Sequence, residues 1–308
     1  MKAIVFPGQG SQYVGMGKEF YDNFKEVKQV FEEVDDALNF KLSKLILEGP
    51  KQDLDLTENT QPAIMTVGVA IYKVLIKEKI KNLNQFKFFA GHSLGEYTAL
   101  ICADSLNLRE GAKLLKARGK FMQEAVPINI GAMAAVLGVE LSFLNEILSK
   151  NNNNEISQIS NDNCPGQIVI SGHKNKINEI LKILKEDHKK KAVLLPVSAP
   201  FHCSLMQPAA DRMKDLFKNI VFKKPQTDII SNVTAKLVED CSLISDLLFK
   251  QITSTVRWRE SIDFMVQNGV QEFLEIGPGK ALSGMIKRIS VDLKISSIDN
   301  ISQLNEFN

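Results

Sequence analysis

The segment Gly91-His92-Ser93-Leu94-Gly95 constrains the fold of this chain more than any other feature. It fits the G-x-S-x-G pattern of a nucleophile elbow, in which a serine occupies a sharp turn between a strand and a helix. Apolar residues at 86–89 predict a buried strand before the turn, and residues 94–102 predict a helix after it. The two glycines allow a strained turn without Cβ clashes. The pattern predicts a serine hydroxyl raised above a sheet edge; a surface turn without chemistry is the alternative.

Strands and helices alternate along the parts of the chain on either side of its middle. Residues 3–6 predict a first strand, and residues 273–276 predict a late strand that ends at Gly277-Pro278-Gly279. One of the helices between them is predicted over residues 62–79, with Thr60 as N-cap and Pro62 in the first turn. Such alternation predicts an α/β fold with a hydrolase-like, mostly parallel sheet and helices on both faces.

The middle of the chain follows a different order of elements. The hydrophobic pattern predicts, in order, a strand at 132–137, a helix at 141–148, strands at 156–159 and 167–170, a helix at 177–185 and a strand at 192–197. This β-α-β-β-α-β order is typical of ferredoxin-like α+β modules. We therefore expect a small ferredoxin-like subdomain, residues 127–196, inserted into a large discontinuous α/β catalytic subdomain formed by residues 1–126 and 197–308.

Charge and cysteine content exclude several classes of protein. The 38 basic and 36 acidic residues nearly balance, which argues against a dedicated nucleic-acid-binding protein. We find no run of 18 apolar residues, so no membrane span is expected, and the apolar stretch at the N-terminus is too short for a signal peptide. The four cysteines are widely spaced and form no CxxC pair, which predicts reduced thiols in a cytoplasmic protein.

A serine nucleophile needs a base within hydrogen-bonding reach, and the chain has four histidines. His202 is the best candidate, because Ser198-Ala199-Pro200-Phe201-His202 lies where the chain re-enters the large subdomain, at the expected mouth of a cleft. A structural histidine at a helix start is the alternative. His92 should leave the elbow in a different direction from Ser93, and His173 and His188 lie in polar stretches of the small subdomain.

Arg118 is a second unusual residue, because its neighbours on the predicted helix are apolar. The positions three and four residues away are Leu114, Leu115, Phe121 and Met122. A guanidinium surrounded in this way needs an anionic partner if it is buried. Its planar fork suits a carboxylate, either on a substrate or on an internal Asp or Glu, and the pattern leaves both possibilities open.

The loop Gly8-Gln9-Gly10 after the first predicted strand is a third candidate. It lacks the Lys-Ser/Thr of a P-loop and the complete G-x-G-x-x-G pattern, so a phosphate site is weakly indicated. In elbow enzymes one oxyanion donor is the amide after the nucleophile, here Leu94, and a second comes from another loop. The Gln9 amide could supply that second donor.

Several motifs together resemble the malonyl-CoA:acyl carrier protein transacylases of fatty-acid synthesis. The resemblance covers almost the whole chain, and its motifs occur in the family's order. They are Phe6–Gln12, the elbow Gly91–Glu96, the arginine helix Arg118–Gln123, Asn163–Gln167 of the small subdomain, the histidine loop Ser198–His202, and the closing motif Glu275–Gly279.

The resemblance implies a role for each candidate residue. Ser93 would be the nucleophile and His202 the general base and acid, oriented by Gln251, often through the backbone carbonyl in this family. The backbone amides of Gln9 and Leu94 would form the oxyanion hole. The side chain of Arg118 would be the clamp for the malonyl carboxylate.

The implied reaction moves a malonyl group from CoA to the serine and then to the phosphopantetheine thiol of acyl carrier protein. It requires neither a metal nor another cofactor, and malonyl-CoA is a substrate. Acyl carrier protein is then the partner, with no nucleic acid or membrane involved, and a cytoplasmic monomer is expected. Three alternatives remain: a stand-alone malonyl acyltransferase serving a polyketide synthase, a serine thioesterase or hydrolase, and a catalytically silent binding module.

Overall fold

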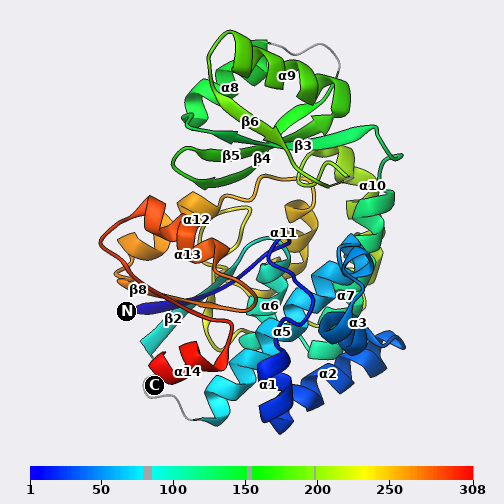
Figure 1. The fold of residues 1–308 in the computed structure, drawn as a ribbon, viewed down its shortest axis with the longest axis vertical. Coiled ribbons are helices and arrows are strands. Elements are labelled where there is room, and N and C mark those ends of the chain that lie inside the picture. The colour runs from blue at the N-terminus through cyan, green and yellow to red at the C-terminus, as the bar shows by residue number, and fades with distance from the viewer. Residues whose placement is uncertain (79–84, 151–154, 198, 308) are drawn as a thin grey trace.

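The computed structural model describes residues 1–78, 85–150, 155–197 and 199–307, and it contains two separate sheets (Figure 1). The larger sheet has the strand order β7-β2-β1-β8-β9, and every neighbouring pair in it is parallel. Its strands are β1 (Lys2–Phe6), β2 (Phe86–Gly91), β7 (Asp228–Ile229), β8 (Glu272–Ile276) and β9 (Lys294–Ile298). The predicted parallel sheet is confirmed.

Helices cover both faces of this sheet, because the central strand β1 is buried on both sides. Ile4 and Phe6 belong to the hydrophobic core that includes α5 and α6, whereas Ala3 and Val5 pack with α12 and α13 on the opposite face. Two-sided burial is usual for a parallel strand. These four helices are α5 (Thr57–Lys77), α6 (Leu94–Cys102), α12 (Trp258–Gln267) and α13 (Ala281–Ile289).

The other helices of the large part surround these two layers. They are α1 (Lys18–Asn23), α2 (Lys25–Leu38), α3 (Leu42–Glu48), α4 (Lys51–Leu54), α7 (Leu108–Glu124), α10 (Gln207–Phe217), α11 (Ile244–Gln251) and α14 (Ile301–Phe307). Short 3₁₀ helices cover Ser204–Met206 and Cys241–Leu243. Among the helices in the described ranges, none is both long enough and apolar enough to pass through a membrane.

The start of α5 differs from the prediction. The helix begins at Thr57 with Leu56 as N-cap, so the expected N-cap at Thr60 is wrong, and Pro62 lies inside the helix rather than in its first turn. The Thr60 hydroxyl instead donates to the carbonyl oxygen of Leu54 at 2.5 Å. Local hydrogen bonds of this kind, from a side chain to a nearby backbone oxygen, can satisfy a polar side chain that a sequence pattern associates with a helix end. The expected end at Lys79 lies outside the described residues.

The smaller sheet is antiparallel, with the order β4-β5-β3-β6. Its elements follow the predicted β-α-β-β-α-β succession: β3 (Gly131–Leu137), α8 (Leu141–Lys150), β4 (Ser157–Cys164), β5 (Gln167–His173), α9 (Lys174–Glu186) and β6 (Lys191–Leu194). Helices α8 and α9 lie on the far side of the sheet from the large part (Figure 1). The ferredoxin-like arrangement is confirmed, and the pairing of β3 with β6 brings the entry and exit of this segment together.

A backbone connection joins the small sheet to the large part. The Asp162 amide donates to the carbonyl oxygen of Val256 at 3.0 Å, and the Val256 amide donates to that of Ser160 at 2.8 Å. The segment after α11 therefore extends the edge of β4. Arg259 adds an ion pair to Asp162 at 2.9 Å. These contacts hold the small sheet over the carboxyl ends of the parallel strands, where ligands of such sheets bind.

Candidate active site

Ser93 occupies the predicted elbow between β2 and α6. Its backbone has φ 55° and ψ −106°, a conformation that costs free energy and is found mainly at functional sites. A Cβ on Gly91 would lie 1.9 Å from the carbonyl carbon of Gly95. A Cβ on Gly95 would lie 2.3 Å from the carbonyl oxygen of Phe6. Both positions therefore require glycine, and β1, β2 and α6 approach closely enough to present the hydroxyl at the sheet edge.

His202 lies against the Ser93 hydroxyl. Its Nε2 is 2.8 Å from the Ser93 Oγ, and its Nδ1 is 2.8 Å from the backbone oxygen of Gln251. Because a carbonyl oxygen only accepts, Nδ1 carries the proton and donates it to Gln251, which leaves Nε2 free to accept from Ser93. His202 also has a positive φ of 59°, so both members of the pair are held in unusual backbone conformations.

The environment keeps His202 neutral. Burial and, after it, the nearby positive charge of Arg118 lower the pKa of its imidazole to about 3. The base form is therefore present at neutral pH. A neutral imidazole with its Nδ1 proton committed to Gln251 is able to take the serine proton.

Arg118, on α7, is fully buried and faces the same hydroxyl. Its Nη2 donates to the Ser93 Oγ at 3.0 Å and to the Gln251 Oε1 at 2.8 Å, and its Nη1 donates to the Gln61 Oε1 at 2.8 Å. These acceptors are all neutral, and within the described part of the chain Arg118 forms no salt bridge to a carboxylate. Its Nε, also buried, has no hydrogen-bond partner there. Among the residues that the structure describes, Arg118 does not form the internal ion pair that the sequence left open.

Gln9 and Leu94 border the same cavity as the serine. Phe6 and Gly91 are paired across β1 and β2, which brings the loop after β1 beside the elbow. The His92 amide donates to the Phe6 oxygen at 3.0 Å and holds the two loops together. Leu94 is the first residue of α6, so its amide has no acceptor within the helix.

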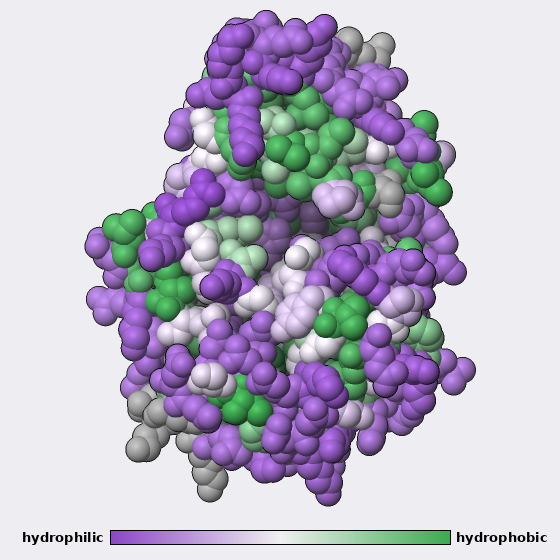
Figure 2. All heavy atoms as spheres, viewed as in Figure 1, coloured by the Kyte–Doolittle hydropathy of each residue, from purple (hydrophilic) through white to green (hydrophobic). Residues whose placement is uncertain are grey.

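The candidate active site is a cavity of about 300 Å³ between the two sheets. The large part contributes Ser93, Arg118 and His202, and the small sheet contributes Met133, Asn161 and Val169, among others. Figure 2 shows the surface hollowed between the two parts, with hydrophobic side chains gathered on the side of the small sheet. No group of three or more His, Cys, Asp or Glu in the described ranges is arranged to hold a metal ion.

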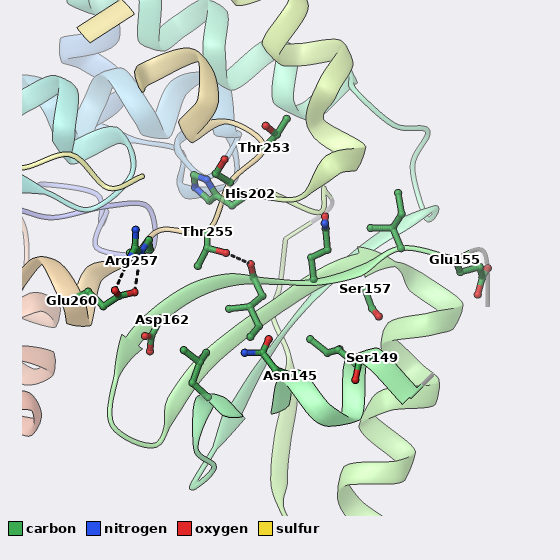
Figure 3. Close-up of a pocket in the computed structure, with 16 residues that line it drawn as sticks. Asn145, Ser149, Glu155, Ser157, Asp162, His202, Thr253, Thr255, Arg257 and Glu260 are labelled. Atoms are coloured by element: carbon green, nitrogen blue, oxygen red, sulfur yellow. Dashed lines mark hydrogen bonds and ion pairs between the residues drawn. The ribbon is translucent and has the colours of Figure 1, made fainter. Parts of the chain in front are cut away.

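A second cavity, of about 750 Å³, lies between the segment after α11 and the β4 and α8 elements (Figure 3). His202 borders this cavity as well as the smaller one, but Ser93 and Arg118 do not line it. The Thr255 hydroxyl donates to the Ile159 oxygen at 2.6 Å across its edge. The serine, the base and the arginine meet in the smaller cavity, which is therefore the site of interest.

The imidazole rings of the other three histidines pair with groups other than the Ser93 hydroxyl. The His92 Nε2 pairs with the Asn163 Oδ1 at 2.9 Å, so the ring leaves the elbow in a different direction, as expected. The His173 Nδ1 accepts from the backbone amide of Ile156 at 2.8 Å. The ring of His188 packs on that of Phe143, with centroids 5.0 Å apart. Each of these rings has a structural partner.

Two residues of the site were missed by the sequence analysis. Asn232 accepts from the Ser93 amide through Oδ1 at 2.7 Å and donates from Nδ2 to the Gly91 oxygen at 2.8 Å, so it braces the elbow. Gln61 holds Arg118 from the first part of α5. Asn232 follows the short strand β7, and a polar residue just after a parallel strand was a signal that could have identified it.

Comparison with known proteins agrees with this geometry. Residues 3–296 match the acyl transferase domain family. The chain is 42% identical over 299 residues to the malonyl CoA-acyl carrier protein transacylase of Bacillus subtilis, an alignment that covers 97% of this chain and 93% of that protein.

Solved structures show the same likeness. An acyl carrier protein S-malonyltransferase from Vibrio cholerae aligns with a TM-score of 0.96 and 39% identity, over 100% of this chain and 99% of that one. A malonyl-transacylase solved in complex with a type II polyketide synthase acyl carrier protein aligns with a TM-score of 0.95 and 37% identity. That alignment covers 99% of this chain and 98% of the other. This chain is thus an acyltransferase and belongs to the malonyl CoA-acyl carrier protein transacylase family.

Proposed function

We propose that Ser93 is the nucleophile and His202 the general base with which this transacylase moves a malonyl group from malonyl-CoA to an acyl carrier protein. The observation that carries this assignment is the 2.8 Å contact between the Ser93 Oγ and the His202 Nε2. The carbonyl of Gln251 supports it, because a hydrogen bond to Nδ1 fixes the tautomer that can accept a proton.

The first half of the reaction forms an ester on Ser93. The hydroxyl proton passes to the His202 Nε2 while the serine oxygen attacks the thioester carbonyl carbon of malonyl-CoA. When the carbon–sulfur bond breaks, the proton moves from His202 to the departing CoA sulfur. The enzyme then holds a malonyl-serine ester and a neutral histidine.

The second half repeats these steps with another thiol. The phosphopantetheine thiol of the carrier protein gives its proton to His202, and its sulfur attacks the ester carbon. The ester bond breaks, and the proton returns to the Ser93 oxygen. His202 therefore acts as base and then acid in each half, and the enzyme is restored.

Gln9 and Leu94 are the proposed oxyanion donors in both halves. Both residues border the cavity beside Ser93, where charge would develop on the carbonyl oxygen. Removing one donor of this kind typically costs about 100- to 1000-fold in rate.

Arg118 is the proposed clamp for the malonyl carboxylate. It is buried beside the serine, and its hydrogen bonds to Gln61, Ser93 and Gln251 all go to neutral oxygens, so a substrate carboxylate would be its anionic partner. The same carboxylate would offset the positive charge that helps to depress the pKa of His202, and so strengthen the base when the correct substrate is present. An acetyl group would leave the guanidinium without that partner.

We further propose that the reaction needs no metal or redox cofactor, because the serine, the histidine and the backbone amides supply each step. The carrier protein belongs either to fatty-acid synthesis, as the resemblance of the sequence motifs implies, or to a polyketide synthase, as in the solved complex of a similar transacylase. The solved complex of a similar transacylase with a polyketide synthase carrier supports a carrier of the polyketide kind as the second candidate. Transfer rates to both kinds of carrier protein distinguish them.

The proposed subdomain limits are 1–126 with 197–308, and 127–196. The separate hydrophobic core of the small sheet and its two helices supports them. Limited proteolysis of the whole chain should cut first near residues 127 and 196, and early cuts within 131–194 would contradict these limits. We also propose a cytoplasmic location and a monomer, which cell fractionation and light scattering test.

Intact-mass measurement tests the central proposal. The protein mixed with malonyl-CoA should gain one malonyl group, which peptide mapping places on Ser93 and which carrier protein carrying phosphopantetheine removes. Ser93→Ala should bind malonyl-CoA without forming the adduct. An adduct on another residue, or one that water but not carrier protein discharges, would contradict the proposal; the second result would indicate a thioesterase.

A further inference from the structure

Glu96 is a buried carboxylate that takes no part in the steps above. It lies in the first turn of α6, three residues after Ser93, with only 2% of its surface exposed. Its Oε2 accepts from the Gln251 Nε2 at 2.7 Å and from the Asn232 amide at 3.1 Å. An ionised carboxylate at such depth is costly unless donors of this kind satisfy it, so the surrounding groups are arranged around it.

Gln251 connects Glu96 to the arginine and the histidine. An ionised carboxylate only accepts and a guanidinium only donates, so the amide must turn Nε2 to Glu96 and Oε1 to Arg118. The opposite orientation would place like groups together at both ends. The backbone oxygen of the same residue holds the His202 Nδ1, so one residue orients both the clamp and the base.

Asn232 connects Glu96 to the nucleophile. Its backbone amide donates to Glu96, while its side chain binds the amide of Ser93 and the oxygen of Gly91. These contacts come from segments far apart in the chain. Glu96 is therefore the point at which the supports of the serine, the histidine and the arginine meet.

We propose that Glu96 is a positioning residue for malonyl transfer: its ionised carboxylate orients Gln251 and Asn232, which in turn hold Arg118, His202 and Ser93. This inference rests on the proposed function of those three residues. Glu96 itself touches none of the reacting atoms. Protonation of its carboxylate weakens the charge-assisted hydrogen bonds from Gln251 and Asn232, and so loosens the support of the site.

The charges around Glu96 place this protonation within an accessible pH range. Burial raises the pKa of the Glu96 carboxyl group, whereas hydrogen bonds from Asn232, Gln251 and Ser231 and the positive charge of Arg118 on α7 lower it. The net result is a pKa of about 7. Tyr97 on the same helix is a further titratable neighbour, and burial raises its pKa above the usual value. Activity should therefore fall as the pH drops below about 7.

The test compares the pH dependence of malonyl transfer in the wild-type protein and in Glu96→Gln, from about pH 5 to about pH 9. Wild-type kcat/KM should fall below neutrality by about tenfold in total and then level off, because a protonated Glu96 is neutral like the Gln of the variant. Glu96→Gln should have a kcat/KM about tenfold lower at alkaline pH, a reduced preference for malonyl over acetyl groups, and no fall at neutral to mildly acidic pH. A matched control is Asp35→Asn, which removes a buried carboxylate of α2 that accepts from Ser43 and should keep the wild-type profile.

A Glu96→Gln protein that keeps the wild-type fall at acidic pH overturns the inference, whatever its maximal rate. If Glu96→Gln does not fold, Glu96→Asp replaces it: an unchanged kcat/KM and acyl preference in that variant also overturns the inference, whereas a lower kcat/KM with the acidic fall retained supports it. Failure of the wild-type protein to form a malonyl adduct on Ser93 would instead contradict the proposed function. The adduct and the pH profile are measured separately, so the two failures are distinguishable.

Discussion

The Nη2 of Arg118 donates a hydrogen bond to the Ser93 Oγ at 3.0 Å, so the guanidinium lies directly beside the nucleophile. The same hydroxyl contacts the His202 Nε2 at 2.8 Å. One oxygen therefore accepts from a cation and can donate to a base. An acyl group on that oxygen would start next to the guanidinium. Arg118 is therefore close enough to the reacting atom to favour acyl groups that carry a carboxylate.

Replacing Arg118 by alanine should reduce malonyl transfer and change acyl preference. Loss of a buried charge partner costs about 3–5 kcal/mol, which predicts a fall in kcat/KM of roughly 10²- to 10⁴-fold for malonyl-CoA. Activity toward acetyl-CoA should rise relative to malonyl-CoA. Competition assays with the two thioesters measure the ratio. Arg109→Ala is the control, because Arg109 is an exposed arginine of the same helix; an unchanged ratio in Arg118→Ala would refute the clamp.

Replacing His202 by alanine should lower the rate of adduct formation by about 10²- to 10⁴-fold, as expected for loss of a general base. Rapid-quench measurement of the malonyl adduct gives this rate. A variant that acylates Ser93 at the wild-type rate would show that the base lies elsewhere.

The same variant should also change stability at acidic pH. The pKa of His202 is about 3 in the folded protein, against an ordinary histidine value of 6.5 in the unfolded chain, so the unfolded chain binds more protons between these values. Wild-type stability should fall as the pH drops below 6.5, by about 2 kcal/mol at about pH 5 from this group. His202→Ala should lack this contribution in urea unfolding, and an equal acid sensitivity of both proteins would contradict it.

Replacing Gly119 by alanine should force α7 away from α5. A Cβ at this position would lie 2.5 Å from the Thr57 oxygen and 2.6 Å from the Glu58 Cα. We expect a loss of about 1–3 kcal/mol in the free energy of unfolding and weaker malonyl transfer, because Arg118 is the preceding residue. Gly284→Ala in α13 is the matched control: its Cβ would meet nothing within 4 Å, so stability should rise by about 0.5–1 kcal/mol. Similar effects of the two substitutions would argue against a close helix contact at Gly119.

The sequence predicted the elements that local patterns specify. The elbow is a strand, a turn and a helix because its apolar runs and glycines act over a few residues. The alternation of elements identified the parallel sheet and the inserted ferredoxin-like segment for the same reason. Local signals failed at α5. Thr60 and Pro62 predicted that the helix starts near residue 61, but it begins at Thr57, and the Thr60 hydroxyl instead donates to the Leu54 oxygen of the preceding segment.

Periodicity marked Arg118 as a charge on a buried helix face, but it could not say what the guanidinium meets there. That was decided by the packing of α5, α7 and α11, which brings Gln61 and Gln251 to its nitrogens from 57 and 133 residues away in the chain. The orientation of Gln251 between Glu96 and Arg118 has the same origin. Sequence patterns determine which faces are buried because burial follows from local hydrophobicity, whereas the pairing of polar atoms depends on distances that exist only once the helices and sheets are packed together.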